Sequence, residues 1–375
     1  MRIAINTRLL LKGKMDGIGW FTAETARRMV LAHPEHTFYF FFDRKPAPEF
    51  IFAPNVVPVV LQPQARLPIL WYLFFEWSVP MALRRYKIDI FLSPDGMIPL
   101  RTKVPTVSVI HDINFEHSPD NLKPMHQRFF TKFYPQYARC ATRVATVSEY
   151  SKHDICDIYH ISEDKMDVVY DGANENYRPH TENEKDAIRR RYTGGCRYLI
   201  FISTIIKRKN LTNLLLAFDR VKSMEPDDLK LVVVGSRVWW QDELAEAYNS
   251  MQHKADVIMP GHVEPADLSA LLSGAEALVY PSYFEGFGIP ILEAMYAETA
   301  VISSNTTSMP EVAGDAAIYI NPASVDDIVH AIRAIREQAV RERLIDVGRR
   351  QREKYSWERT ANLLWSSLMK SIGRV

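Results

Sequence analysis

Short apolar runs bounded by turn residues recur along the first half of the chain. Between and after them lie stretches whose apolar positions recur at helical spacing. This alternation is typical of β-strands and α-helices that follow one another along the chain. The predicted strands of this half are IAIN near residue 4, FYFFF at 38–42, TVSVI at 106–110 and RVATV at 143–147, and the clearest helices are 20–31 and 148–159, the second with Ser148 as N-cap.

The second half repeats this pattern with runs that are almost continuously apolar. Such runs are expected where helices cover both faces of a parallel sheet. Right-handed crossovers then make a doubly wound sheet the economical arrangement of each half. The predicted strands here are YLIFIS (198–203), LKLVVVG (229–235), ADVIMP (255–260), EALVYPS (276–282), AVISS (300–304) and AAIYINP (316–322).

Between the halves, residues 172–197 lose apolar content and gain charge, proline and glycine. A chain of 375 residues with 47% hydrophobic residues is expected to form two domains of about 100–200 residues each. We therefore predict an α/β fold of two Rossmann-like, doubly wound domains that face a central cleft. The expected boundaries are 1–175 for the first domain, 176–197 for a linker and 198–356 for the second domain.

The totals limit the class of partner and the compartment. Forty-six basic and forty-five acidic side chains give a net charge of +1, so nucleic acid, which normally requires a basic excess, is not expected as a partner. Cys140, Cys156 and Cys196 show no CxxC spacing, which fits a reducing cytosol. The N-terminus does not resemble a signal peptide, and the longest strongly apolar run, 67–75, is shorter than the ~20 residues of a membrane-spanning helix. We expect a cytoplasmic protein.

The segment 285–293 (EGFGIPILE) follows a predicted strand and starts a helix near Pro290. Its glycines open the backbone to a ligand, and the amides and helix dipole favour a phosphate or another electron-rich oxygen. Glu285 and Glu293 can each accept hydrogen bonds from sugar or ribose hydroxyls. Taken alone, the segment fits an ordinary strand-to-helix turn equally well.

Lys207, Arg208 and Lys209 follow the strand YLIFIS, and Asn210 is a candidate cap for the next helix. Three adjacent cations beside a strand end could neutralise a diphosphate leaving group. A solvated basic turn is the simpler explanation for such a triplet in isolation.

Two weaker signals lie in the first half. Gly17 and Gly19, in DGIG, permit close approach of the backbone to phosphate, although the full GxGxxG pattern is absent and a flexible turn fits equally well. His111 directly follows a strand and could donate a hydrogen bond to a substrate hydroxyl or phosphate, with Asp112 orienting it. A capping or packing histidine is the simpler alternative.

The aromatic-rich stretch 67–85 has two interpretations. A buried helix of the first domain is favoured because Glu76 and Arg84-Arg85 interrupt any continuous apolar face. A surface that touches an acceptor or a membrane is the alternative. The chain contains no GxxxxGK[ST], HExxH, GxSxG or Asp-x-Asp motif, so we expect chemistry that does not depend on a metal.

Taken together, these segments resemble the retaining glycosyltransferases of the GT-B fold in family 4. The family's signature is a glutamate, seven residues and a second glutamate, which is the spacing of Glu285 and Glu293. DGIG (16–19) is similar to the family's first glycine loop and IHD (110–112) to its VHD. Further matches in the same order are VATVSEYSKHD (144–154), DVVYDGANENYRP (167–179), RKN (208–210) and SSNTTSMPEVAGDAAIYINP (303–322).

The resemblance implies roles for the residues in these segments. Arg208 and Lys209 would contact the donor diphosphate, and Glu293 would contact the ribose. Glu285 would meet the transferred hexose together with the backbone of Gly286, Phe287 and Gly288.

Further roles are implied on the acceptor side and at the base. The acceptor would lie near His111 and the DGIG loop, whose Gly17 and Gly19 we also include among the donor-binding candidates. The catalytic candidates are therefore His111, Glu285 and Lys209, with no metal ligand. We expect the base to be recognised near Gly261, His262 and Val263. The helix at 357–375 would cross back onto the first domain.

The implied reaction transfers a hexose, with retention, from a nucleotide diphosphate sugar to a saccharide or lipid-linked saccharide in surface polysaccharide synthesis. Similarity to bacterial O-antigen and exopolysaccharide mannosyltransferases favours GDP-mannose over a UDP-sugar, with no further cofactor. Peripheral association with the inner face of the cytoplasmic membrane is an open alternative to a purely cytoplasmic location. A non-catalytic nucleotide-sugar binding protein is the alternative function, whereas a nicotinamide enzyme lacks its glycine pattern.

Two departures from the family pattern affect the donor side. Many relatives have Gly-Arg where this chain has Ser203-Thr204, so one cation for the diphosphate is missing. Where relatives often have CGTPV, this chain has AETAV (297–301), with Glu298 and Ala300 in place of glycine and proline.

Overall fold

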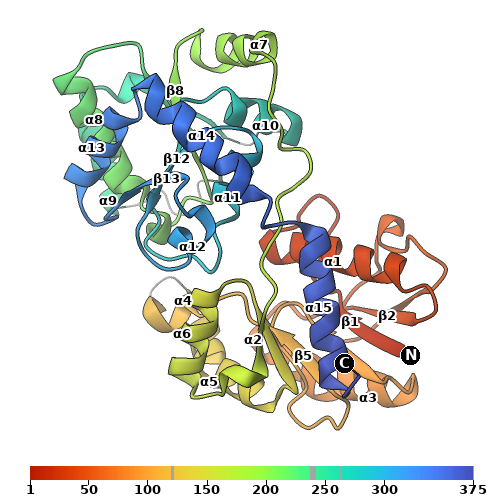
Figure 1. Cartoon of the computed structure of the whole chain (residues 1–375). Coiled ribbons are helices and arrows are strands. Elements are labelled where there is room, and N and C mark those ends of the chain that lie inside the picture. Colours follow the sequence, from red (N-terminus) through yellow and green to blue (C-terminus); the bar gives the residue numbers. More distant parts are fainter. Residues whose placement is uncertain (120–121, 237–241, 262, 375) are drawn as a thin grey trace. The chain divides into compact units, whose positions relative to one another are not determined.

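The computed structural model describes residues 1–119, 122–236, 242–261 and 263–374. They form two compact units, each with its own core (Figure 1). The first unit comprises Met1–Asp171 and Ser356–Val375, and the second comprises Gly172–Tyr355.

The first unit contains a parallel sheet of seven strands in the order β3-β2-β1-β4-β5-β6-β7. Chain order reverses between β1 and β4, and ligands of open α/β sheets bind at such a switch point. The strands are β1 (Arg2–Asn6), β2 (Thr37–Phe42), β3 (Val56–Val60), β4 (Ile90–Ser93), β5 (Thr106–Val109), β6 (Arg143–Thr146) and β7 (Met166–Val168).

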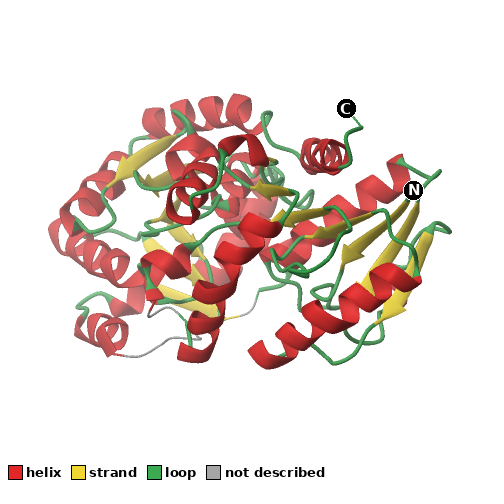
Figure 2. Cartoon of the chain, turned by 90° about the horizontal axis from the view of Figure 1, so that it is seen from below, coloured by secondary structure: helices red, strands yellow, loops and turns green. Residues whose placement is uncertain are grey.

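Helices cover this sheet, and Figure 2 shows the strands lying between helices within each unit. The C-terminal helix α15 belongs to the first unit, where it packs along α1 and over β5, β6 and β7 (Figure 1). The helices are α1 (Gly17–Ala32), α2 (Pro68–Leu73), the π-helical turn η2 (Phe74–Ser78), α3 (Val79–Arg85), α4 (Asn114–His117), α5 (Pro124–Cys140), α6 (Glu149–Tyr159) and α15 (Trp357–Ser371).

The second unit contains a parallel sheet of six strands in the order β10-β9-β8-β11-β12-β13. This is the dinucleotide-fold order, with its switch point between β8 and β11. The strands are β8 (Tyr198–Ile202), β9 (Lys230–Val234), β10 (Val257–Gly261), β11 (Ala277–Tyr280), β12 (Ala300–Ser304) and β13 (Ala317–Ile320). The helices are α7 (Glu182–Thr193), α8 (Leu211–Met224), α9 (Asp242–Ser250), α10 (Pro265–Ser273), α11 (Ile289–Tyr296), α12 (Met309–Ala313), α13 (Val325–Ala334) and α14 (Gln338–Arg352).

All ten predicted strands are present, and the sequence pattern missed three. β3 contains Pro58, which a strand tolerates at the edge of a sheet, where β3 lies. β4 and β7 span only four and three residues, and neither was among the predicted strands. The predicted α/β fold of two doubly wound sheets is confirmed.

The segment that we expected to be a linker contains helix α7. Thr181 and Glu184 form a reciprocal capping box at its start, and Gly194 ends it in a left-handed conformation. The helix buries Ile188 and Thr193 and packs on α10. Because its remaining surface is charged, its composition resembles that of a linker. The boundary between the units falls earlier, after Asp171.

Candidate active site

The switch point of the second unit brings two predicted segments together. β8 and β11 are neighbouring strands, so the loops that follow them emerge side by side at the carboxyl edge of the sheet. One loop carries the helical turn η5 (Lys207–Lys209), and the other carries residues 281–288. A backbone hydrogen bond of 2.9 Å from the Tyr283 amide to the Arg208 carbonyl joins the loops.

Glu285 is the centre of a buried ion-pair network at this edge. Its Oε1 accepts hydrogen bonds from Lys209 Nζ at 2.6 Å, Tyr280 Oη at 2.9 Å and Ser282 Oγ at 2.5 Å. Its Oε2 accepts one from Arg208 Nη1 at 3.0 Å. Burial alone would raise the pKa of this carboxyl, but Lys209 and Arg208 lower the pKa to about 2. The site therefore holds a carboxylate between two cations at neutral pH.

The backbone of the Glu285–Gly288 turn is anchored from the loop after β12. The Glu285 amide donates to Thr307 Oγ1 at 3.2 Å, and Ser308 Oγ donates to the carbonyls of Glu285 and Phe287 at 2.9 Å each. Gly288 has a φ of +104°, which favours glycine, and leads into α11. Thr307 and Ser308 lie in a segment that resembles the family, but no role was predicted for them.

The Phe287 ring packs edge-to-face on Tyr355, with centroids 5.4 Å apart. This places its side chain in the packing of the second unit. Only the backbone of Phe287 is therefore suited to a ligand.

Glu293 lies in α11, as predicted, and pairs with a residue that the sequence analysis did not single out. Tyr177 hydrogen-bonds to its carboxyl group. Burial raises the pKa of Glu293 to about 7, against the lowering effect of the Tyr177 hydroxyl. Tyr177 lies in the family-like segment 167–179, so position in that segment was the available signal.

The residues predicted for base recognition follow β10. Gly261 ends that strand with a φ of +79° and has open space where a side chain would begin. Val263 is buried. His262 lies outside the described residues. β10 is the edge strand, two strands from β8, so its loop lies at the same carboxyl edge as Arg208 and Lys209.

Asn210 precedes α8 as predicted, but its side chain does not cap the helix. Asn210 has a left-handed backbone (φ 58°), and its Nδ2 donates to the carbonyls of Pro281 at 3.0 Å and Pro322 at 2.7 Å. Its side chain therefore joins the loops after β11 and β13 to the basic turn. The capping prediction was wrong because those loops offer buried carbonyls to the amide.

In the first unit, the DGIG loop is the first turn of a helix. α1 begins at Gly17, earlier than the predicted start near Trp20, and Asp16 Oδ1 caps it by accepting from the Gly19 amide at 2.9 Å. A Cβ on Gly19 would lie 3.0 Å from the Leu9 carbonyl oxygen. Gly19 is thus required by close packing, while Gly17 faces open space.

His111 follows β5 and is oriented by a backbone carbonyl. Its Nε2 lies 2.9 Å from the Pro94 oxygen, which can only accept, so Nε2 carries the hydrogen and Nδ1 of a neutral ring is an acceptor. Burial lowers its pKa, and the Phe21 ring packs edge-on at 4.8 Å. Asp112 instead accepts from the Asn114 amide at 2.9 Å, so the predicted orienting role of Asp112 was wrong.

A buried polar group at the switch point of the first unit was not predicted. Arg8 Nε donates to Asp95 Oδ2 at 2.6 Å, and Asn6 Nδ2 donates to Asp95 Oδ1 at 2.8 Å. Tyr134 Oη donates to the Asp95 carbonyl at 3.0 Å. Asn6 ends β1, Arg8 and Asp95 follow β1 and β4, and Tyr134 lies in α5, so the group fixes the loops after both strands. Among the described residues, no group of three His, Cys, Asp or Glu side chains could hold a metal ion.

Family models match both halves of the chain. The model for Glycosyltransferase Family 4 matches residues 15–177, and the model for Glycosyl transferases group 1 matches residues 184–351. The O-antigen chain mannosyltransferase B of Escherichia coli is 30% identical over 279 residues, which cover 74% of this chain and 73% of that protein. The chain belongs to glycosyltransferase family 4.

Other similar proteins agree with this family 4 assignment. O-antigen chain mannosyltransferase RfbU of Salmonella typhimurium is 28% identical over 286 residues, 76% of this chain and 75% of that protein. A sucrose-phosphate synthase structure from Thermosynechococcus elongatus has a TM-score of 0.79 at 16% identity and covers both chains completely. Anabaena HepE in complex with UDP and glucose has a TM-score of 0.75 at 15% identity over 99% of this chain and 100% of that chain. The predicted GT-B fold is confirmed, and this family 4 protein is a glycosyltransferase.

One departure from the family 4 pattern has a visible compensation. Glu298 has a φ of 58°, the left-handed region that favours glycine. Arg349 of α14 contacts its carboxylate at 2.6 Å, and Arg352 lies at 3.6 Å. These ion pairs hold the turn before β12 in the conformation that glycine adopts without strain.

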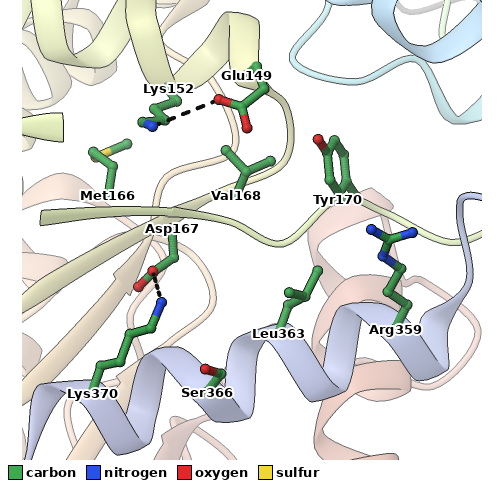
Figure 3. A pocket seen from close by; sticks show the side chains of 10 residues that line it. All are labelled: Glu149, Lys152, Met166, Asp167, Val168, Tyr170, Arg359, Leu363, Ser366 and Lys370. Carbon is green, nitrogen blue, oxygen red and sulfur yellow. Dashed lines mark hydrogen bonds and ion pairs between the residues drawn. The ribbon is translucent and has the colours of Figure 1, made fainter. Parts of the chain in front are cut away.

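A hollow of about 260 Å³ lies elsewhere in this family 4 chain, within the first unit (Figure 3). It is lined by residues of α6, β7 and α15, including Lys152, Asp167 and Lys370. Lys370 contacts Asp167 at 2.9 Å, and Lys152 contacts Glu149 at 3.9 Å. These two ion pairs join charges within the lining, and none of the predicted site residues lines it.

Proposed function

We propose that this glycosyltransferase moves a hexose, mannose in the first instance, from GDP-mannose to a saccharide or lipid-linked saccharide in surface polysaccharide synthesis at the cytoplasmic face of the membrane. The mannosyltransferase names of its relatives support the sugar and the pathway class. The observation that carries the proposal is the pairing of Arg208 and Lys209 with Glu285 at the switch point of the second unit.

The cations also contact groups other than Glu285, since Arg208 Nη1 donates to the Phe284 carbonyl and Lys209 Nζ donates to Tyr280 Oη at 2.9 Å. Arginine has five N–H donors and lysine three, and we propose that both share these donors between the carboxylate and a diphosphate. Neutralising the leaving diphosphate is the main electrostatic demand of the reaction. In the proposed site, Arg208 and Lys209 meet this demand in place of a metal ion, and the missing arginine of Ser203-Thr204 is not required.

Glu285 is proposed to bind the hexose through Oε2. Oε1 accepts three hydrogen bonds, whereas the one described contact of Oε2 is with Arg208. A carboxylate oxygen can accept about two hydrogen bonds, so Oε2 has capacity for a sugar hydroxyl. Glu293, with Tyr177, is proposed to bind the ribose.

In the proposed reaction, the bond between the anomeric carbon and the donor phosphate oxygen breaks. The anomeric carbon then bonds the acceptor hydroxyl oxygen on the same face, which retains the configuration. The acceptor proton passes to the departing phosphate oxygen, so no side chain forms a covalent intermediate. His111 is proposed to accept a hydrogen bond from an acceptor hydroxyl at Nδ1.

A ligand panel tests the donor. GDP, UDP, ADP and their sugars are added separately, and the unfolding midpoint is measured. We expect GDP and GDP-mannose to stabilise the protein by ~2.7 kcal/mol at a hundredfold excess over the dissociation constant. Stabilisation by UDP-sugars alone would reject GDP-mannose as the donor. Binding without transfer to any acceptor would favour the alternative of a non-catalytic nucleotide-sugar binding protein.

Lys209→Met tests the site, with Lys207→Met as its matched control. Lys207 is in the same basic turn, but its side chain is 80% exposed and 3.7 Å from Glu243. We expect Lys209→Met to reduce kcat/KM by well over tenfold, because a buried charge on the leaving group is lost. Lys207→Met should stay within about twofold. Equal effects of the two variants, with unfolding midpoints unchanged, would refute the site.

A further inference from the structure

The segment from α2 to α3 exposes apolar side chains in an unusual pattern. Between residues 67 and 83, every exposed residue is apolar. This stretch holds five of the fourteen exposed large hydrophobic residues found among the described part of the chain. The five are Leu67 at 47% exposure, Ile69 at 63%, Leu73 at 37%, Trp77 at 64% and Met81 at 60%. We call them the apolar stripe.

The opposite face of the same segment is anchored in the core. Trp71, Phe74, Phe75 and Val79 are buried, and Trp71 stacks on Phe130 of α5, with centroids 5.7 Å apart. The sequence analysis favoured a buried helix here, and that prediction holds for this face alone. The stripe is therefore backed by the core of the first unit.

The π-helical turn η2 keeps the stripe straight. Residues four apart rotate steadily around a regular α-helix, because one turn takes 3.6 residues. η2 spans Phe74–Ser78 and widens the helix by one residue at this point. Ile69, Leu73, Trp77 and Met81 therefore stay in line over roughly 18 Å.

The acidic side chain within this segment is turned away from solvent. Glu76 is the one acidic residue between residues 66 and 87, and its Oε1 accepts from the Leu100 amide at 2.9 Å. This contact explains how a glutamate is accommodated between Leu73 and Trp77. It also removes a negative charge from the exposed face.

Exposed cations border the stripe. Arg66, Arg84, Arg85 and Lys87 are exposed, and no described acidic side chain lies within ion-pair distance of them. The neighbouring helix α5, together with Lys123 before it, adds exposed cations and has no acidic residue. The cations there are Lys123, Arg128, Lys132 and Arg139. Since the whole chain carries only +1, this is a local concentration of positive charge.

We propose that the apolar stripe docks on a bilayer whose headgroups are anionic. An apolar face with tryptophan, flanked by arginine and lysine, matches an interfacial helix that inserts by ~5–10 Å. Anionic lipid attracts each basic residue near the surface. A second copy of this chain would place the same cations opposite one another in an isologous contact, which disfavours that occupant. The inference is independent of the donor and of the sugar transferred.

Vesicle flotation tests this proposal with the full chain. The probe vesicles are phosphatidylcholine alone and an equal mixture of phosphatidylcholine and phosphatidylglycerol. We expect binding to the mixed vesicles, at least roughly tenfold weaker binding to phosphatidylcholine, and weakening as salt increases. Absence of binding to the mixed vesicles would overturn the proposal.

Two pairs of variants separate the apolar and the electrostatic parts. Trp77→Ser with Met81→Ser, and Arg84→Glu with Arg85→Glu, should each lower the partition coefficient at least roughly tenfold. Their controls are Met224→Ser, also an exposed methionine, and Arg343→Glu with Arg350→Glu, which are exposed on α14. Controls should stay within about twofold, and all variants should keep the unfolding midpoint of the parent. If the parent forms a dimer that Trp77→Ser with Met81→Ser dissociates, and vesicle binding is unchanged, the stripe is a protein interface and the proposal fails.

Discussion

Glu285 and Glu293 lie on one strand-to-helix segment, yet the pKa values of their carboxyl groups shift in opposite directions. Both are affected first by burial, which raises the pKa. Glu285 has two cations that lower its pKa to about 2, whereas Glu293 has only the Tyr177 hydroxyl and reaches about 7. Glu285 is therefore permanently charged, while Glu293 titrates near neutral pH.

Glu293→Gln should stabilise the protein at high pH. The unfolded chain loses this proton near pH 4.5 and the folded protein near pH 7, so stability falls as pH rises between these values. Removing the ionisable group should increase the free energy of unfolding at pH 8 by about 1–3 kcal/mol and leave it unchanged below pH 4.5. Chemical denaturation at the two pH values measures this, with the exposed Glu353→Gln as control. Equal stability of parent and variant at pH 8 would contradict it.

Tyr177→Phe should act in the opposite direction. Its hydroxyl lowers the pKa of Glu293, so its loss raises that pKa further and lowers stability at pH 8. If Glu293 binds ribose as a carboxylate, the pH at which nucleotide affinity is half-maximal should also move upward. Titration of the nucleotide across pH 6–9 measures the shift, and an unchanged profile would remove Tyr177 from the site.

Gly235→Ala should disrupt the loop after β9. Gly235 has a φ of +153°, and a Cβ there would lie 1.8 Å from the Ser203 carbonyl oxygen, far inside contact distance. We expect destabilisation by more than about 3 kcal/mol, or displacement of the loop that carries Ser203-Thr204. Gly195→Ala is the control, since its φ is +90° but nothing lies within 4 Å. Thermal unfolding of the two variants measures the difference, and equal losses would show that the close approach is unimportant.

At the level of single residues, the sequence predicted those with a recognisable spacing and missed their partners. Glu285, Arg208 and Lys209 were found because they follow strands and match a family pattern. The sequence did not predict the hydroxyl partners of the two glutamates, because a hydroxyl that contacts a carboxylate has no periodicity in the sequence. These partners are Ser282, Tyr280 and Tyr177. Asn210 shows the converse case. It occupies a cap position, but its side chain donates to buried carbonyls instead of capping the helix.

At the level of elements, α15 completes the first unit. Its Trp365 stacks on His33, with centroids 3.6 Å apart, and Trp357 meets Phe21 edge-on at 6.1 Å. Leu364 and Leu368 are fully buried. Residues 1–171 would therefore expose part of their core without this helix.

Leu364→Ala should destabilise the first unit by about 2–5 kcal/mol, because it leaves a cavity in a fully buried position. Leu363→Ala is the matched control, because Leu363 is itself partly exposed and its truncation should cost less than half as much. Urea denaturation of both variants measures the effect. Equal losses would show that α15 does not pack as described.

Elements with a long apolar run were predicted from sequence, while short or charged elements were not. β4 and β7 are recognised only through the ladders that they form with β1, β5 and β6. Helix α7 has a strongly charged exposed face, so composition alone suggested a linker. The order of the strands within each sheet could not be predicted from the sequence either. That order makes β8 and β11 neighbours.

At the level of the whole molecule, two separate cores predict two unfolding events. One core lies entirely within residues 4–166 and the other within residues 199–344. If the nucleotide binds to the second unit as proposed, it should raise the unfolding temperature of that unit, and Leu364→Ala should lower that of the first unit. Differential scanning calorimetry resolves the two. A single transition that responds equally to both changes would mean that the units unfold together.

No described helix is long and apolar enough to span a bilayer. The nearly neutral net charge of +1 conceals an uneven surface, with cations concentrated around the apolar stripe of residues 67–81. Global totals could not have predicted this surface, because opposite charges elsewhere cancel it. The local sequence contained the signal, in the four-residue spacing from Ile69 to Met81.

The carboxylate between Arg208 and Lys209 bears on inhibitor chemistry. A highly charged diphosphate mimic would share both cations with the carboxylate that already neutralises them, which reduces the gain from its own charge. A neutral linker would leave Glu285 paired and would lose less hydration on binding. If the proposed donor site is correct, selective compounds should therefore place their polarity at the ribose and hexose ends, next to Glu293 and Oε2 of Glu285.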